Sequence, residues 1–247
     1  MAIQVLKNCK AYLDGYDLTG NSNKVELNYS ADSLENTVFS ATTKSRQAGL
    51  KNVEVSLEGY WEAGAGKIDA AMGANLDAGG LVGKIITLCP TGGAANEPFF
   101  SFENIFGEFQ LGAQVGELLP FSYSGGGSDD EGLIKGTVLE NAAKTATAAG
   151  TGRQIGQVAA GQHVYAVMHV LAVSGTNPTL DMVIESDDNA GFLTAEDRIT
   201  FPQVTAVSAA WGTRVAGAIT DNYWRASWTI GGTNNPSFTV FVGVAIM

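Results

Sequence analysis

The stretch from Val53 to Trp61 constrains the fold of this chain more than any other, because its side chains alternate between apolar and polar. One side carries Val53, Val55, Leu57, Gly59 and Trp61, and the other carries Glu54, Ser56, Glu58, Tyr60 and Glu62. A period of two is typical of a strand with one buried and one wet face. The sequence therefore predicts a β-strand whose wet face bears carboxylates.

A polar run without periodicity precedes this strand. It spans Ser40 to Gln47, and its only charged residues are Lys44 and Arg46. Such a run predicts a mobile loop that leads into a rigid strand. Before it, a Ser or Asp ahead of Glu35 predicts a short turn of helix within Ser30–Phe39.

The composition favours turn-rich β-structure. The 247 residues include 31 glycines and 45% apolar residues, which is enough for a real core. Glycine supplies the positive φ that tight turns require. A Gly/Ser/Asp-rich stretch at 125–132 predicts a flexible linker, so we expect a first β domain at 1–124 and a second at 133–247.

One helix and several further strands are expected around this boundary. Apolar residues within Ile68–Leu76 recur at helical spacing, so this is the best helix candidate. In the second half, Gln162–Ser174 and Thr179–Glu185 predict a hairpin that turns at Gly175–Pro178. Short strands follow at regular spacing, which favours a β-sandwich or barrel.

The charge excludes a protein that grips nucleic acid through its phosphates. The net charge is −11, spread over both halves, and Lys and Arg do not cluster anywhere. An acidic surface is compatible with a conduit through which DNA slides, because like charges repel the backbone. Cys9 and Cys89 are expected to be buried thiols. The N-terminus lacks a signal-peptide pattern and no apolar run reaches membrane-spanning length, so we expect synthesis in the cytoplasm and no membrane partner.

No persuasive catalytic, cofactor or metal set can be built from the residues. The chain has no nucleophile elbow and no phosphate loop, and its two histidines, His163 and His169, lie within one expected strand. The acidic run Glu185–Gly191 misses the spacing of a calcium loop, and a solvated hairpin loop is the better interpretation. These absences favour an assembly protein over an enzyme.

The first half resembles the major tail (tail tube) proteins of long-tailed bacteriophages. The stretch that carries the resemblance is Leu34–Gly64, LENTVFSATTKSRQAGLKNVEVSLEGYWEAG. It holds a Thr37-Val38-Phe39 segment, a polar loop, the Gly49-Leu50 step and the alternating strand. The helix at Ile68–Leu76 and a strand pair at Leu81–Cys89 and Val115–Tyr123 follow in the same order. The resemblance covers about half of the chain.

The resemblance implies a homo-oligomer without catalysis or cofactor. In that family, subunits form stacked rings whose strands close an inner β-barrel, DNA passes as cargo, and tape measure and terminator proteins are partners. It implies that Glu54, Glu58 and Glu62 face the lumen. It also implies that a loop formed by Ser40, Thr42, Thr43, Lys44, Arg46 and Gln47 reaches the adjacent ring. The expected location is the virion tail, after synthesis in the host cytoplasm.

The second half departs from the minimal family pattern and leaves alternatives open. It is either an outward-facing sandwich on a hexameric ring or a second tube-like domain, in which case three subunits complete a pseudo-hexameric ring. A capsid decoration protein is the structural rival. A carbohydrate-binding β module is the rival from another class, with Tyr60, Tyr223 and Trp224 as its aromatic platform.

Overall fold

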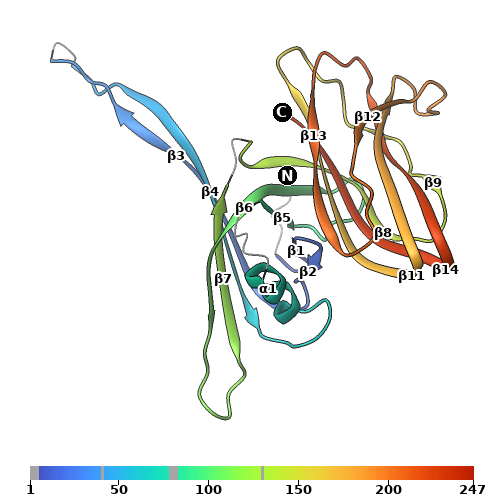
Figure 1. Cartoon of the computed structure of the whole chain (residues 1–247). Helices are drawn as coiled ribbons and strands as arrows, with labels where there is room; N and C mark the ends of the chain where they lie inside the picture. Colours follow the sequence, from blue (N-terminus) through green and yellow to red (C-terminus); the bar gives the residue numbers. More distant parts are fainter. Residues whose placement is uncertain (1–5, 40–41, 78–82, 129–130) are drawn as a thin grey trace.

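The computed structural model describes residues 6–39, 42–77, 83–128 and 131–247. These residues form mainly antiparallel β-structure and one short helix, which confirms the predicted fold class (Figure 1). The first half contains β1 (Lys10–Leu13), β2 (Tyr16–Asp17), β3 (Ser22–Glu35), β4 (Arg46–Tyr60), α1 (Ile68–Asp77), β5 (Lys84–Cys89), β6 (Pro98–Leu111) and β7 (Pro120–Gly127). The second half contains β8 (Ile134–Lys144), β9 (Ala148–Ala149), β10 (Arg153–Gln154), β11 (His163–Asp187), β12 (Glu196–Thr200), β13 (Ser208–Ala216) and β14 (Tyr223–Ile246).

The second half is built on one long ribbon formed by β11 and β14. The two strands pair antiparallel from Val164 opposite Ile246 to Asp187 opposite Tyr223. The predicted hairpin within β11 is therefore wrong, because both of its arms pair with β14 and not with each other. Gly175 and Gly232 have positive φ angles of 104° and 117°, so these turn-forming residues bend the ribbon without reversing the chain.

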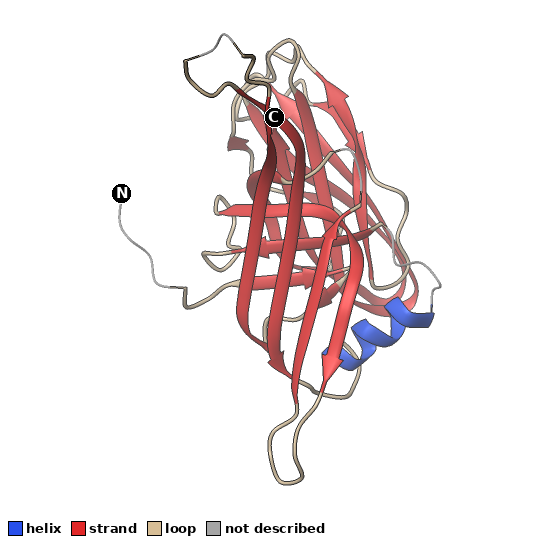
Figure 2. Cartoon of the chain, turned by 90° about the vertical axis from the view of Figure 1, so that its left-hand side faces the viewer, coloured by secondary structure: helices blue, strands red, loops and turns tan. Residues whose placement is uncertain are grey.

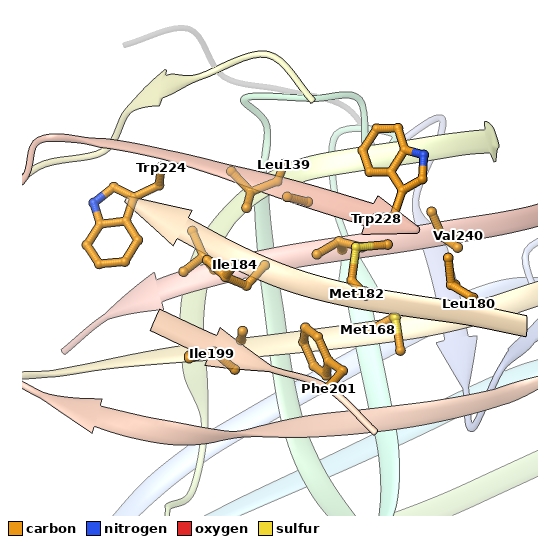
Figure 3. Packing of buried hydrophobic residues seen from close by; sticks show 14 of the residues in the cluster. Leu139, Met168, Leu180, Met182, Ile184, Ile199, Phe201, Trp224, Trp228 and Val240 are labelled. Carbon is orange, nitrogen blue, oxygen red and sulfur yellow. The ribbon is translucent and has the colours of Figure 1, made fainter. Parts of the chain in front are cut away.

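The bent ribbon supplies strands to both layers of a sandwich. In one layer the ribbon is flanked by β13 and β8, and in the other layer it is flanked by β12, β9 and β10. The core between them holds Leu180, Met182 and Ile184 from β11 together with the two tryptophans of β14 (Figure 3). Both layers bury apolar side chains here, so this half holds its own core.

The first half has a smaller core under the helix. Val53, Val55 and Leu57 of β4 are buried with Ile68 and Met72 of α1, among others. The helix spans the residues predicted for it and one more, Asp77. Of the expected strand at Leu81–Cys89, Leu81 and Val82 lie outside the described residues, and β5 begins at Lys84.

The two halves are joined by a continuous sheet and a shared core. Strand β6 pairs with β8 through Pro98–Ser101, and a third apolar cluster combines Tyr12 and Phe99 with Tyr165 and Phe241. Within the expected linker, residues 125–127 belong to β7, and Asp129 and Asp130 lie outside the described residues. Glu131 accepts a hydrogen bond from Trp211 Nε1 at 2.7 Å and pairs with Arg214. The division at 125–132 remains a prediction, but the described part of this connection is anchored.

Candidate functional site

The candidate site is a four-stranded sheet in the order β3, β4, β7, β6. Every neighbouring pair in it is antiparallel. Figure 2 shows these long strands running side by side along one side of the molecule. The alternation in β4 is confirmed, since Val53, Val55, Leu57 and Gly59 are buried on the core side. The opposite side of the sheet has no helix or strand of the described chain packed on it in either figure, and it is polar.

The polar face is acidic. Cross-strand register places these residues in rows on it: Lys24, Glu58, Ser122 and Gln110; Glu26, Ser56, Ser124 and Glu108; Asn28, Glu54, Gly126 and Ile105. Four carboxylates therefore share the face with one ammonium group, that of Lys24, which forms an ion pair with Glu58. Two shallow concavities of about 460 and 380 Å³ lie along it. The face can repel a polyanion, because its exposed carboxylates make the local electrostatic potential negative.

Sequence reasoning placed Glu54 and Glu58 on this face but missed Glu26 and Glu108. Glu26 could have been predicted, because Val25, Leu27 and Tyr29 alternate on the other side of β3. Glu108 could not have been predicted, because a bulge at Gly107 shifts the register of β6 against β7. Glu62 lies beyond the end of β4. There it pairs with Lys67 at 2.8 Å, and the hydrogen bond from Lys67 lowers the pKa of its carboxyl.

Both edges of the four-stranded sheet are open. Within the described residues, β3 pairs only with β4, and the segment of β6 from Ile105 to Leu111 pairs only with β7. An open edge presents unpaired backbone N–H and C=O groups, which is a template for another strand. Two long open edges on one sheet are an assembly surface unless something covers them.

Strands β3 and β4 continue past the sheet as a two-stranded arm. The described residues of the arm, which follow Asn28 in β3 and precede Val53 in β4, are exposed on both faces, apart from half-buried Gly49. Figure 1 shows the arm projecting away from the rest of the molecule. Its exposed apolar side chains are Tyr29, Leu34, Val38, Phe39 and Leu50. An isolated hairpin is marginally stable in water, so the arm is suited to being covered by a partner.

The predicted loop before β4 is shorter than expected, and the predicted helical turn is wrong. Residues 31–35 belong to β3, because they pair with β4 up to Glu35 opposite Arg46. Arg46 and Gln47 are thus strand residues, while Thr42, Thr43 and Lys44 lie at the described end of the arm. Ser40 lies outside the described residues. Lys44 forms an ion pair with Glu35 at 3.0 Å, which links the two strands near their tip.

The two histidines lie in different surroundings. His169 is fully buried and both of its ring nitrogens are engaged. Nδ1 accepts a hydrogen bond from the Gly15 N–H at 3.2 Å, and Nε2 donates to Thr87 Oγ1 at 2.8 Å. Burial lowers its pKa to about 3. His163 lies at the start of β11, where its ring contacts Tyr165.

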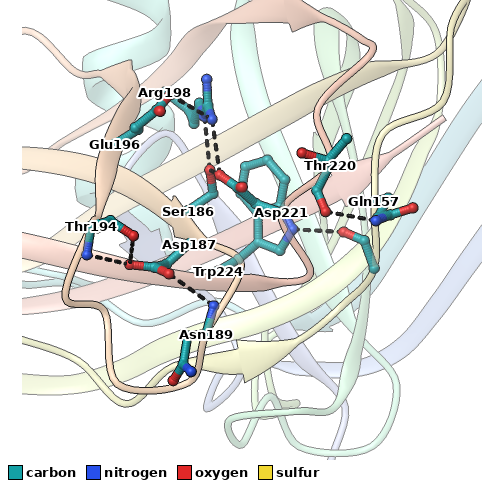
Figure 4. Close-up of polar contacts among 11 residues, drawn as sticks. Gln157, Ser186, Asp187, Asn189, Thr194, Glu196, Arg198, Thr220, Asp221 and Trp224 are labelled. Atoms are coloured by element: carbon teal, nitrogen blue, oxygen red, sulfur yellow. Dashed lines mark hydrogen bonds and ion pairs between the residues drawn. The ribbon is translucent and has the colours of Figure 1, made fainter.

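The acidic run after Glu185 forms a loop that is held by hydrogen bonds to its own Asp187 carboxylate. One Asp187 oxygen accepts from the Asn189 N–H at 2.8 Å and the other from the Thr194 N–H at 2.8 Å (Figure 4). The hydrogen bond from Asn189 has the larger effect, and together with that from Thr194 it holds the pKa of Asp187 below its usual value. Residues 188–191 are exposed and join the antiparallel strands β11 and β12, as expected for a solvated hairpin loop. Asp187 itself is buried, because its carboxylate caps the turn. In the described part of the chain, no three His, Cys, Asp or Glu residues are grouped so that they could hold a metal ion.

The aromatic platform of the carbohydrate-binding alternative is not formed. Trp224 is fully buried and its Nε1 donates to the Gly156 carbonyl at 2.8 Å (Figure 4). It therefore packs in the sandwich core, where a sugar cannot reach it. Among the described residues, no helix is both long enough and apolar enough to cross a membrane.

Comparisons with known proteins give structural neighbours of low similarity. No family model matches the chain, and no curated protein matches it in sequence. A chain of the virion of a native gene transfer agent particle aligns with a TM-score of 0.43 at 10% identity, covering 51% of this chain and 95% of that one. A chain of the six-fold symmetrised baseplate of the anti-feeding prophage gives 0.42 at 9% identity, covering 55% and 97%. The Dit protein of phage SPP1 gives 0.34 at 9% identity, covering 98% and 100%. Likenesses at this level assign neither a family nor a function.

Proposed function

We propose that this chain is a self-assembling structural subunit of a bacteriophage tail tube, without catalysis or cofactor. The observation that carries the proposal is the four-stranded sheet with two open edges and one exposed, acidic face. A virion tail is the location it implies, with other tail proteins as partners at the ends of the tube. The sequence resemblance of the first half points to the same role.

The edges of the sheet are suited to joining copies in a ring. Because β3 and β7 run in the same direction and β6 runs opposite to both, β6 of one copy meets β3 of the next antiparallel. Each junction continues an all-antiparallel sheet. Repeated around a ring, the junctions close a barrel and cover the facing edges of the four-stranded sheets.

Barrel geometry favours six copies. With strands about 4.8 Å apart and tilted by about 40°, 24 strands from six copies enclose a barrel roughly 48 Å across. Twelve strands from three copies give roughly 24 Å between backbones, and inward-pointing side chains would leave too little room for a DNA duplex. The trimeric alternative needs four lumen strands from the second half. There, however, Val164–Val170 of β11 is buried on both faces, so it offers no wet face.

The acidic face then lines the bore, and the arm extends along the tube axis. Carboxylates from β3, β4 and β6 would repel the DNA backbone, so DNA passes as cargo without binding. The arm would cover its apolar side chains on the neighbouring ring. The sandwich of the second half lies on the other side of the sheet from the acidic face and would face outward (Figure 1).

Electron microscopy of the purified chain tests the proposal. We expect rings and stacked tubes as the concentration rises, and immunogold labelling of virions on the tail. A chain that stays monomeric at high concentration would contradict the tube. Discrete oligomers bound to the shell would instead identify the capsid decoration alternative.

Charge reversal in the bore should make the tube retain DNA. In Glu54→Lys/Glu108→Lys tubes, two carboxylates per copy become ammonium groups on the acidic face, so DNA should co-sediment in a salt-dependent manner. Tubes of the unaltered chain should leave DNA in the supernatant. The matched control reverses two exposed carboxylates of the second half, Asp181→Lys/Asp197→Lys. Equal DNA retention by both variants would place the acidic face outside the bore.

A further inference from the structure

A basic cavity lies beside the beginning of β3. Its volume is about 530 Å³, and its lining includes Lys7, Lys10 and Lys24. The whole chain has only 14 Lys and Arg residues against 25 Asp and Glu, so three lysines around one cavity are a local reversal of charge. The cavity is a candidate binding site for carboxylates.

Polar groups in the cavity are available to a ligand. Among the described residues, neither Lys7 nor Lys10 forms an ion pair, whereas Lys24 pairs with Glu58. Ser22 also lines the cavity, and its Oγ is buried without a hydrogen-bond partner in the described chain. Two unpaired ammonium groups and an unsatisfied hydroxyl together favour an anionic partner.

The position of the cavity identifies the partner by geometry. Ser22 and Lys24 belong to the first residues of β3, whose outer edge is open. Asn23 of β3 and Gln110 of β6 line the same concavity, so the start of β3 and the end of β6 lie at one end of the sheet. When β6 of a neighbouring copy pairs with this edge, the loop after its Leu111 arrives beside the basic cavity.

That loop carries a single carboxylate. Residues 112–119 include Glu117 and no other acidic residue. The loop is exposed and extends from the sheet at the end where β6 finishes (Figure 1). One Glu117 oxygen accepts the Gln114 N–H at 3.4 Å, a long bond that an ammonium group can outcompete.

We infer that the basic cavity of one copy receives Glu117 of the neighbouring copy within a ring. The inference rests on the proposed function, because it requires β6 to pair with β3 of the next copy. The contact would select the correct register of the junction, since a strand edge alone permits slippage.

Zero-length carbodiimide cross-linking of assembled tubes tests the contact directly. The reagent joins a carboxylate to an amine only where the two touch, and mass spectrometry identifies the joined peptides. We expect Glu117 linked to Lys10, Lys7 or Lys24 between copies in tubes, and no such link in dilute monomer. Glu117 linked elsewhere, or not at all, in well-formed tubes would overturn the inference.

A charge swap gives the second readout. Lys10→Glu and Glu117→Lys should each raise the concentration needed for ring formation about tenfold, and the double variant should restore it. Lys135→Glu combined with Glu117→Lys is the matched control and should not restore it, because Lys135 is exposed on β8, away from the β3 edge. Circular dichroism of each variant confirms folding.

The outcomes separate the inference from the proposed function. Unaltered protein that forms no rings would overturn the proposed function and the inference with it. Rings that tolerate both single variants, or single defects that the double variant fails to repair, would overturn the inference alone.

Discussion

A chain whose arm is replaced by a tight turn is expected to fold, to form rings and to form no tubes. The variant joins Ser30 to Asn52, which are paired across β3 and β4, through Asn-Gly in place of residues 31–51. The removed residues that the structure describes lie outside the apolar core clusters, so the melting temperature should change by only a few degrees. Stacking should fall to background, because the arm is the element that projects furthest from the sheet. Negative-stain microscopy and light scattering measure ring and tube populations.

Point substitutions separate the arm's chemistry from its length. Phe39→Ser removes a fully exposed aromatic ring near the tip, and tubes should become shorter. Leu193→Ser removes an apolar side chain that is also exposed but lies in the second half, so it serves as the matched control. Tubes of ordinary length from the arm-deleted chain would show that stacking uses another surface.

Local patterning was enough to predict the face of the site. The alternation in β4 correctly separated its buried side from its wet side, and the stripe in α1 correctly placed the helix. Both patterns arise because each element rests on one core, so its period is preserved in the sequence. The arm was mistaken for a helical turn and a loop for the opposite reason. Its residues touch no core, so no burial period marks Ala31–Glu35 as a strand.

Long-range pairing was beyond the sequence. Gly175–Pro178 carries every local sign of a hairpin, and only the register against β14 shows that the ribbon bends there instead. The open edges that define the site follow from the same kind of information. Which strand lacks a neighbour depends on the whole sheet order, and the bulge at Gly107 depends on β7. Neither the open edges nor the bulge can be predicted from the sequence of one strand alone.

Acid is expected to weaken the folded chain through His169. This residue connects three elements across both halves: the β1–β2 turn at Gly15, β5 at Thr87, and β11. Thr87 Oγ1 lies 2.8 Å from Ser101 Oγ, which donates to the Ile86 carbonyl, so each proton of the network has a defined acceptor. Protonation of Nδ1 would place its N–H against the N–H of Gly15, which would then lose its acceptor. The network therefore requires a neutral ring.

The pH range follows from the direction of the shift. The folded pKa of His169 is lowered from 6.5 to about 3, so below about pH 6.5 the unfolded chain binds the proton first. The stability that this network contributes is present above that pH and is lost as the pH falls toward 3. Between pH 7 and pH 5 the loss is about 2 kcal/mol, at about 1.4 kcal/mol per unit once the unfolded histidine is protonated.

A glutamine at this position isolates the effect from the many carboxylates that also titrate. His169→Gln should be less stable than the unaltered chain at pH 7, because it breaks the network. That deficit should shrink by about 2 kcal/mol at pH 5, since only the histidine chain carries the protonation cost. Urea unfolding at both pH values measures the difference. His163→Gln, on the same strand but half-exposed, controls for the loss of a histidine. If the deficit of His169→Gln were equal at both pH values, His169 would not be the group that couples acid to the junction between the halves.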